Sequence, residues 1–213
     1  MNEINNFWEE CYKSFGLSVD SEENSIFEKE MECTDIFLSL LEKGSVILDY
    51  SCSIKENSIF LLKEGFNVTI GDISERSIET CKENLIKNGL NANLLNCVSK
   101  SEHESKFDGI LCWNVLDHMP LQKSINLLED LYKICNEDGI LMCSFNEKCN
   151  FDKSSYTELE DGSILLTKEN NEKVKINFFT NEEILNMFKD KWEILYFSAA
   201  IGECEKVIIC RKK

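Results

Sequence analysis

Acidic side chains follow two consecutive short apolar runs of the chain. Asp49 ends the run 46–48, and Asp72 comes just after the run 66–70. If these runs are neighbouring parallel strands, their carboxyl ends meet at one edge of a sheet, which is where open α/β sheets bind ligands. A carboxylate after the second strand can accept two hydrogen bonds from a ribose diol. Asp72 is therefore the leading candidate for a nucleoside contact, with turn formation in 71–74 as the alternative.

The third and fourth apolar runs end in further polar or sulfur-bearing residues. Cys97 and Val98 end the third run, and Asn114 follows the fourth. His118 comes a few residues later and is the candidate general base, with a structural role at a helix start as the alternative. Asp117 beside it is expected to cap that helix.

Strands and helices alternate in the pattern that must position these residues. Short apolar runs separated by amphipathic stretches predict a mostly parallel sheet covered on both faces. The expected strands of this part are 46–48, 66–70, 93–97, 107–112 and 139–145, and the expected helices are 57–63, 74–87 and 121–135.

The pattern changes after residue 145. Asp161–Gly162 predicts a hairpin between 156–159 and 164–166, and 174–179 is a further possible strand. Thr180 is the expected cap of a helix whose first turn is acidic. The segments 192–197 and 206–210 predict two closing strands.

Length and composition limit the classes of protein to consider. The 213 residues, 43% of them hydrophobic, suit a single domain over 1–213. No segment is long and apolar enough to cross a membrane, and the 11 cysteines are scattered singly, so we expect a cytoplasmic protein with reduced thiols and no metal site. The net charge of −16 argues against nucleic acid and anionic membranes as partners. Nothing in the sequence predicts the oligomeric state.

Three segments resemble the motifs of one enzyme family. Residues 46–53 with 61–69 and 72–74 are similar to the first cofactor motif of class I S-adenosylmethionine-dependent methyltransferases. Residues 107–112 with 115–118 resemble the fourth-strand motif of that family, and 131–145 resemble its helix-and-strand unit. Residues 56–58 and the C-terminal segment are also similar to the small-molecule, tellurite-resistance type.

The resemblance implies a Rossmann-like, doubly wound fold with seven strands, the last of them antiparallel. It implies a cofactor-binding core at 45–145 and a β insertion at 150–180 on the acceptor side. It also implies S-adenosylmethionine as the cofactor. The residues expected to bind it are Asp49, Ser51, Ser53, Asp72, Ile73, Cys97, Val98 and Asn114.

The loop after the first strand departs from the family pattern. Ser51, Ser53 and Lys55 occupy positions where glycines usually let the backbone approach the cofactor. We therefore expect methyl transfer to a small-molecule acceptor, and keep a non-catalytic module with weak or lost cofactor binding as the alternative. An NAD-dependent oxidoreductase is disfavoured because no Gly-x-Gly-x-x-Gly follows the first strand.

The N-terminal segment is acidic and carries interspersed aromatic residues. Trp8 and Tyr12 are four positions apart and would share a face of a helix. We expect residues 1–30 to form a helical lid over the acceptor, with ordinary packing of this helix on the core as the alternative.

Overall fold

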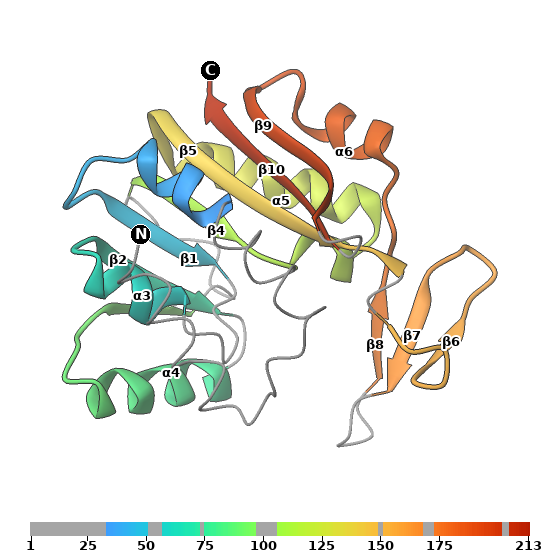
Figure 1. The fold of residues 1–213 in the computed structure, drawn as a ribbon, viewed down its shortest axis with the longest axis horizontal. Coiled ribbons are helices and arrows are strands. Elements are labelled where there is room, and N and C mark those ends of the chain that lie inside the picture. Colours follow the sequence, from blue (N-terminus) through green and yellow to red (C-terminus); the bar gives the residue numbers. More distant parts are fainter. Residues whose placement is uncertain are drawn as a thin grey trace.

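The computed structural model describes residues 33–50, 57–72, 75–96, 106–148, 151–167, 173–201 and 205–213. Its main feature is a seven-stranded sheet in the order β3-β2-β1-β4-β5-β10-β9 (Figure 1). The strands are β1 (Val46–Tyr50), β2 (Asn67–Asp72), β3 (Asn93–Asn96), β4 (Phe107–Cys112), β5 (Cys135–Asn146), β9 (Trp192–Ile201) and β10 (Glu205–Lys212).

The strand directions confirm the predicted doubly wound fold. Strands β1 to β5 pair in parallel, whereas β10 runs antiparallel to both β5 and β9. Because β10 is reversed, its first residue lies at the edge where the parallel strands end. Glu205 is indeed the register partner of Asn146, the last residue of β5.

Helices cover both faces of the sheet, so its central strands are apolar on both sides. A helix at 33–39, α3 (Asn57–Lys63) and α4 (Glu75–Lys87) pack on one face, around Phe37, Leu61 and Leu85. On the other face, α5 (Leu121–Ile134) and α6 (Asn181–Phe188) pack through Leu128 and Phe188. Alternation along β10 places Val207 in the first cluster and Ile208 in the second.

Neighbouring atoms lie so close to Gly109 and Gly139 that a side chain at either position would collide with them. A Cβ on Gly109 of β4 would lie 2.8 Å from Leu41 Cδ1, so the absent side chain lets the segment after the first helix pack tightly. A Cβ on Gly139 of β5 would lie 2.8 Å from the carbonyl oxygen of Asn136. Backbone atoms cannot move aside as a side chain can, and we expect only glycine to fit at position 139.

The strand β5 begins earlier than the sequence predicts. We expected it at 139–145 after a helix that ends at Cys135, but α5 ends at Ile134 and β5 starts at Cys135. The register with β4 shifts between the pairs Phe107↔Cys135 and Gly109↔Ile140. Asp138 has a left-handed φ of 60° inside this irregular stretch. The alternation of apolar residues is interrupted there, so it does not predict the true start of the strand.

The predicted insertion forms a small antiparallel sheet of β6 (Tyr156–Glu158), β7 (Ile164–Thr167) and β8 (Lys173–Ile176). Figure 1 shows this sheet to one side of the main sheet, beyond the end of β5. The hairpin is confirmed, with Gly162 at a φ of +81° and Asp161 Oδ1 accepting from the Ser163 amide. The expected strand 174–179 is too long, because the Asn177 amide leaves the ladder to donate to the Asp117 carbonyl.

The helix α6 begins as predicted. Thr180 Oγ1 accepts from the Glu183 amide at 3.2 Å, and the Glu183 carboxylate accepts from the Thr180 amide at 2.8 Å. This reciprocal pair is a capping box, which satisfies two of the amide groups that a helix start leaves open.

Candidate functional site

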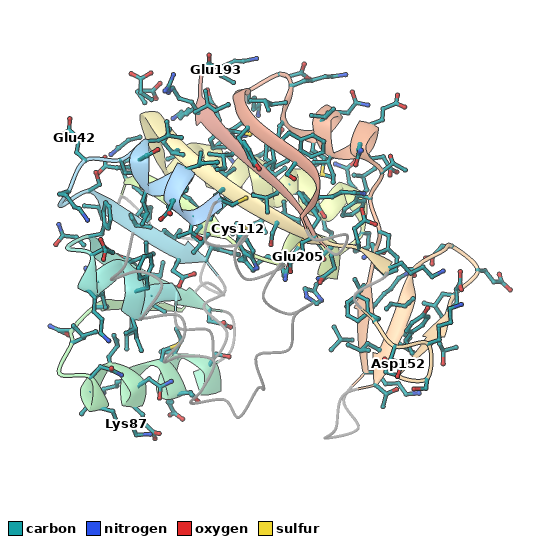
Figure 2. The ribbon with its side chains drawn as sticks, in the orientation of Figure 1. Glu42, Lys87, Cys112, Asp152, Glu193 and Glu205 are labelled. Atoms are coloured by element: carbon teal, nitrogen blue, oxygen red, sulfur yellow. The ribbon has the colours of Figure 1, made fainter. Side chains whose placement is uncertain are left out.

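Polar side chains from five strands or strand ends meet at the carboxyl edge of the parallel sheet. Asp49 and Asp72 come from the adjacent strands β1 and β2, and Asn114 follows β4. Ser144 lies near the end of β5, and Glu205 begins β10. Figure 2 shows Glu205 on the same side of the sheet as Cys112, the last residue of β4.

Asp49 is almost fully buried, with 3% of its surface exposed. The Ser58 hydroxyl, in the first turn of α3, donates to its Oδ2 atom. This bond connects the start of α3 to the end of β1 and holds these two elements together at the carboxyl edge of the sheet.

Asp72 is buried at the carboxyl end of β2, as the sequence predicts. It is the register partner of Asn96 at the end of β3, and the neighbouring residue Gly71 pairs with Tyr50 of β1. Asp49 and Asp72 are therefore close to each other along one edge, on adjacent strands.

Asn114 is held in a left-handed conformation, with a φ of 50°. Its amide N–H donates to Ser144 Oγ at 2.9 Å, and the Ser144 hydroxyl donates back to Asn114 Oδ1 at 2.7 Å. The Asn114 Nδ2 atom donates to Glu205 Oε1 at 2.8 Å. Asparagine adopts this backbone region more readily than most residues, and these bonds fix which way its amide group points.

The expected helix cap at Asp117 is wrong. The start of α5 has no side-chain cap, and Asp117 is fully buried instead. Its Oδ2 accepts from the amide and the side-chain Nδ2 of Asn146, at 2.8 and 2.7 Å. The carboxylate therefore stabilises the end of β5 rather than the helix.

The small sheet is attached at this same place. The Asn177 amide and its Nδ2 atom both donate to the Asp117 carbonyl, at 2.8 and 2.9 Å. Lys206 Nζ donates to the Phe179 carbonyl at 2.7 Å and pairs with Glu147 at 2.5 Å. The segment that follows β8 is thus bonded to the turn that contains Asp117 and to β10, beside the end of the main sheet that carries Asn114 and Glu205.

His118 is exposed on a 3₁₀ turn, η1 (Leu116–His118), beside Asp117. Its role as a general base stays a prediction. The other expected site residues lie outside the described residues: Ser51, Ser53, Ile73, Cys97 and Val98 of the cofactor set, and Trp8 and Tyr12 of the lid.

Sequence reasoning missed four polar residues at this edge: Ser58, Ser144, Asn177 and Glu205. Each acts through a partner distant in sequence, so spacing alone does not reveal it. Glu205 had one usable signal: the first residue of an antiparallel last strand must lie where the parallel strands end.

The thiols near this edge belong to the core. Burial raises the pKa of Cys143 well above its usual value, with the neighbouring Cys112 thiol as a further cause. The six cysteines that the structure describes are buried and none of them is in a disulfide, and that they are reduced stays a prediction. Within the described ranges, no helix is long and apolar enough to span a membrane, and no group of three potential metal ligands is present.

Comparisons with known proteins agree with this geometry. A family model described as "Methyltransferase domain" matches residues 28–191. The ribosomal protein L11 methyltransferase of Thermotoga neapolitana is 30% identical over 105 residues, which are 49% of this chain. The matched segment spans 38% of that relative, so this chain covers well under half of its length.

Solved structures share the fold at low identity. A SAM-dependent methyltransferase from Methanosarcina mazei superposes with a TM-score of 0.69 at 23% identity, covering 83% of this chain and 96% of the other. The 1,6-didemethyltoxoflavin-N1-methyltransferase of Burkholderia thailandensis gives 0.63 at 17% identity, covering 100% and 92%. Such identities show the fold alone, so the narrower resemblance to tellurite-resistance enzymes stays a prediction.

The alternative of a non-catalytic module receives no support from these comparisons. The family model covers more than half of the chain, and the sheet order and the acidic strand ends agree with it. The chain therefore belongs to the methyltransferase domain family, and its fold is that of the Rossmann-like methyltransferases that depend on S-adenosylmethionine.

Proposed function

We propose that this protein transfers a methyl group from S-adenosylmethionine to a small-molecule acceptor. The observation that carries the proposal is the pair of buried carboxylates, Asp49 and Asp72, at the carboxyl edge of a doubly wound sheet in a methyltransferase-family chain. In such sheets this edge is the ligand crevice.

Asp72 fits the ribose of the cofactor. Its carboxylate has the two acceptor oxygens that a diol requires, and it sits where the second strand ends. We assign Asp49, Ser51, Ser53, Ile73, Cys97, Val98 and Asn114 to the remainder of the cofactor site, as the family resemblance implies. Ser58 holds Asp49 in place, and Ser144 holds Asn114.

When bound, S-adenosylmethionine supplies an activated methyl group on a sulfonium. The task of the chain is then alignment, because in-line displacement requires donor, methyl carbon and nucleophile to lie on one axis. A general base is needed only for a nucleophile that carries a proton at working pH, and we assign that role to His118. Excluding water is the other task, for which we propose the segments 1–30 and 150–180.

Two observations support a small acceptor. The toxoflavin-type methyltransferase, whose structure is described with bound 1,6-didemethyltoxoflavin and S-adenosylhomocysteine, shares the fold over the full chain. The bonds of Asn177 and Lys206 also fix the segment after β8 beside the strand ends, so the β6–β8 sheet that precedes it can wall a small site. One relative is described as a ribosomal protein L11 methyltransferase. Methylation of a protein by this chain would therefore contradict the proposed small-molecule acceptor.

The test is calorimetric titration of the purified protein with S-adenosylmethionine and S-adenosylhomocysteine. We expect binding of both, and Asp72→Ala should weaken it by about 1–3 kcal/mol, the scale of hydrogen bonds to a charged group. Glu193→Gln is the control, because Glu193 is exposed at the far end of the sheet (Figure 2). Absence of binding by the parent protein, or unchanged affinity in Asp72→Ala, would refute the cofactor assignment.

A further inference from the structure

Asn177 connects the small β6–β8 sheet to the turn that carries His118. It is the first residue after β8, and its bonds go to η1 and the residue that follows η1. Its amide N–H and its Nδ2 atom donate to the Asp117 carbonyl at 2.8 and 2.9 Å. The Nδ2 atom also donates to the Met119 carbonyl at 3.1 Å. One residue therefore bonds the carbonyl groups of both neighbours of His118.

These bonds act where the backbone changes conformation. The 3₁₀ turn η1 ends at His118, and Met119 is already extended, with φ −136° and ψ 156°. The last carbonyl groups of a helical turn have no partner within the turn and need donors from elsewhere. Asn177 supplies such donors, so the place of His118 depends on a segment that is distant in sequence.

The backbone around His118 is also fixed from the side of β5. Leu116 and Asp117 are fully buried, and Asp117 Oδ2 accepts two hydrogen bonds from Asn146 at the end of β5. His118, in contrast, is exposed. An exposed side chain on a fixed backbone is what a group that must meet a bound molecule in one geometry requires.

Asn177 is itself held in place. The residue before it, Ile176, is buried. Two residues later, the Phe179 ring packs edge-on against Phe145 of β5, with 6.0 Å between ring centroids. Lys206 Nζ of β10 donates to the Phe179 carbonyl at 2.7 Å. The segment that carries Asn177 is therefore anchored to two strands of the main sheet.

We propose that Asn177 positions His118 for removal of a proton from the acceptor. This inference rests on the proposed methyl transfer, in which His118 is the general base. A general base must lie within hydrogen-bond reach of the proton that it takes, and a displacement of about 1 Å can lower the rate by about 100-fold. The small sheet thus contributes to the chemistry through Asn177, in addition to enclosing the acceptor.

The proton transfer balances without a further reactant. A neutral ring nitrogen of His118 takes the proton of an acceptor hydroxyl or thiol group. The acceptor atom bonds to the methyl carbon as the carbon–sulfur bond breaks, and the electron pair of that bond stays on sulfur. His118 then gives the proton to solvent, to which its side chain is exposed.

A double-mutant cycle tests the positioning role. The rate measured is methyl transfer from tritium-labelled S-adenosylmethionine to a panel of small phenols and thiols. His118→Gln should lower kcat by about 100-fold. Asn177→Ala should lower kcat by about tenfold in the parent protein, but by less than about twofold in the His118→Gln background, with KM for S-adenosylmethionine unchanged. A merely structural role would lower kcat by the same factor in both backgrounds.

Two further variants separate hydrogen bonding from packing and from stability. Asn177→Asp keeps the size of the side chain and the backbone N–H, but it replaces the Nδ2 donor with an oxygen that faces two carbonyl oxygens. It should lower kcat at least as much as Asn177→Ala, whereas a space-filling role would leave kcat at the parent value. Thr180→Ala is the control, because Thr180 bonds to Glu183 in α6 and its loss destabilises the same segment without touching η1.

NMR relaxation gives a measurement that needs no acceptor. The backbone amide order parameters of His118 and Met119 should be about 0.85 in the parent protein and should fall below about 0.6 in Asn177→Ala and Asn177→Asp. Thr180→Ala should leave them unchanged. Unchanged order parameters in both Asn177 variants would refute the positioning role.

The outcomes distinguish this inference from the function on which it rests. Equal losses of kcat in both backgrounds refute the positioning role alone. An unchanged kcat in His118→Gln refutes the assigned base, and the inference with it, while methyl transfer stands. A parent protein that binds the cofactor but methylates no member of the panel refutes the hydroxyl or thiol acceptor, and the order parameters then decide the role of Asn177. A parent protein that does not bind S-adenosylmethionine refutes the proposed function.

Discussion

Ser58 shows how one side chain can hold a neighbouring carboxylate in place. Ser58 is only 4% exposed, and its hydroxyl donates to the buried Asp49 carboxylate. Ser58→Ala removes a donor from a buried charged acceptor, which should lower the free energy of unfolding by about 1–3 kcal/mol. Urea titration measures this loss. Ser39→Ala, which removes an exposed hydroxyl bonded to the Ile36 carbonyl, should change stability by less than about 0.5 kcal/mol.

The buried cysteines should be unreactive in the native protein. Burial raises the pKa of Cys135 to about 12 and also raises the pKa of Cys210, so the nucleophilic thiolate is scarce at neutral pH. Brief treatment with iodoacetamide at pH 7.5, followed by peptide mapping, should leave these two and Cys143 unlabelled. The same treatment in guanidinium should label all three. Equal labelling in both conditions would show that the core around β5 opens readily.

Sequence reasoning placed correctly those candidate residues whose position depends only on where a strand ends. Asp49 and Asp72 were predicted because a strand end needs only a local apolar run to be recognised. The backbone strain of Asn114 and its bond to Glu205 were not predicted, since both depend on how β4, β5 and β10 align. Asp117 was misread for the same reason: its partner, Asn146, lies at the end of the next strand.

Among the elements, α6 depends visibly on its first turn. Thr180→Ala removes the side-chain acceptor for the Glu183 amide and should lower the free energy of unfolding by about 1 kcal/mol. Glu183→Gln keeps an oxygen that can accept from the Thr180 amide and should cost less. Thermal unfolding followed by circular dichroism compares the two. An equal or greater loss in Glu183→Gln would show that charge, rather than the capping box, stabilises the helix start.

The small β6–β8 sheet should lose stability in acid. The hydrogen bond from Lys175 holds the pKa of Asp161 below its usual value, with the Ser163 hydrogen bonds as further causes. A carboxylate whose pKa is lowered in the folded state stabilises it fully above its unfolded value of 3.8 and progressively less as pH falls below that. Hydrogen-exchange protection of 164–167 and 173–176 should therefore decrease below pH 4. Asp161→Asn should remove that pH dependence.

Element boundaries were predictable where local signals are strong. The Asp161–Gly162 turn and the Thr180 cap carry their own chemistry, so both were placed correctly. The start of β5 and the end of β8 were not, because a register shift against β4 and the contact between Asn177 and Asp117 decide them. Those are tertiary contacts, which periodicity cannot report.

At the scale of the molecule, the alternation of apolar runs and amphipathic stretches predicted the two covered faces. The antiparallel last strand came from family resemblance, since no local signal distinguishes it from the parallel strands. Its reversal is what brings Glu205 to the edge where the parallel strands end, a position that composition and spacing do not indicate.

The last prediction concerns how the acceptor is enclosed. Among the described residues, we propose the β6–β8 sheet as one wall, because Asn177 and Phe179, which follow its last strand, are bonded to Asp117 and Lys206. Methyl transfer also requires exclusion of water from the other side, and the sequence offers the aromatic pair Trp8 and Tyr12 for this role. Deleting residues 1–25 should therefore abolish methylation of a small-molecule panel while calorimetry still detects cofactor binding. Deleting only residues 1–6, which keeps both aromatic residues, should preserve turnover. Full activity after the longer deletion would rule out the lid, and loss of cofactor binding would show that this segment supports the core instead.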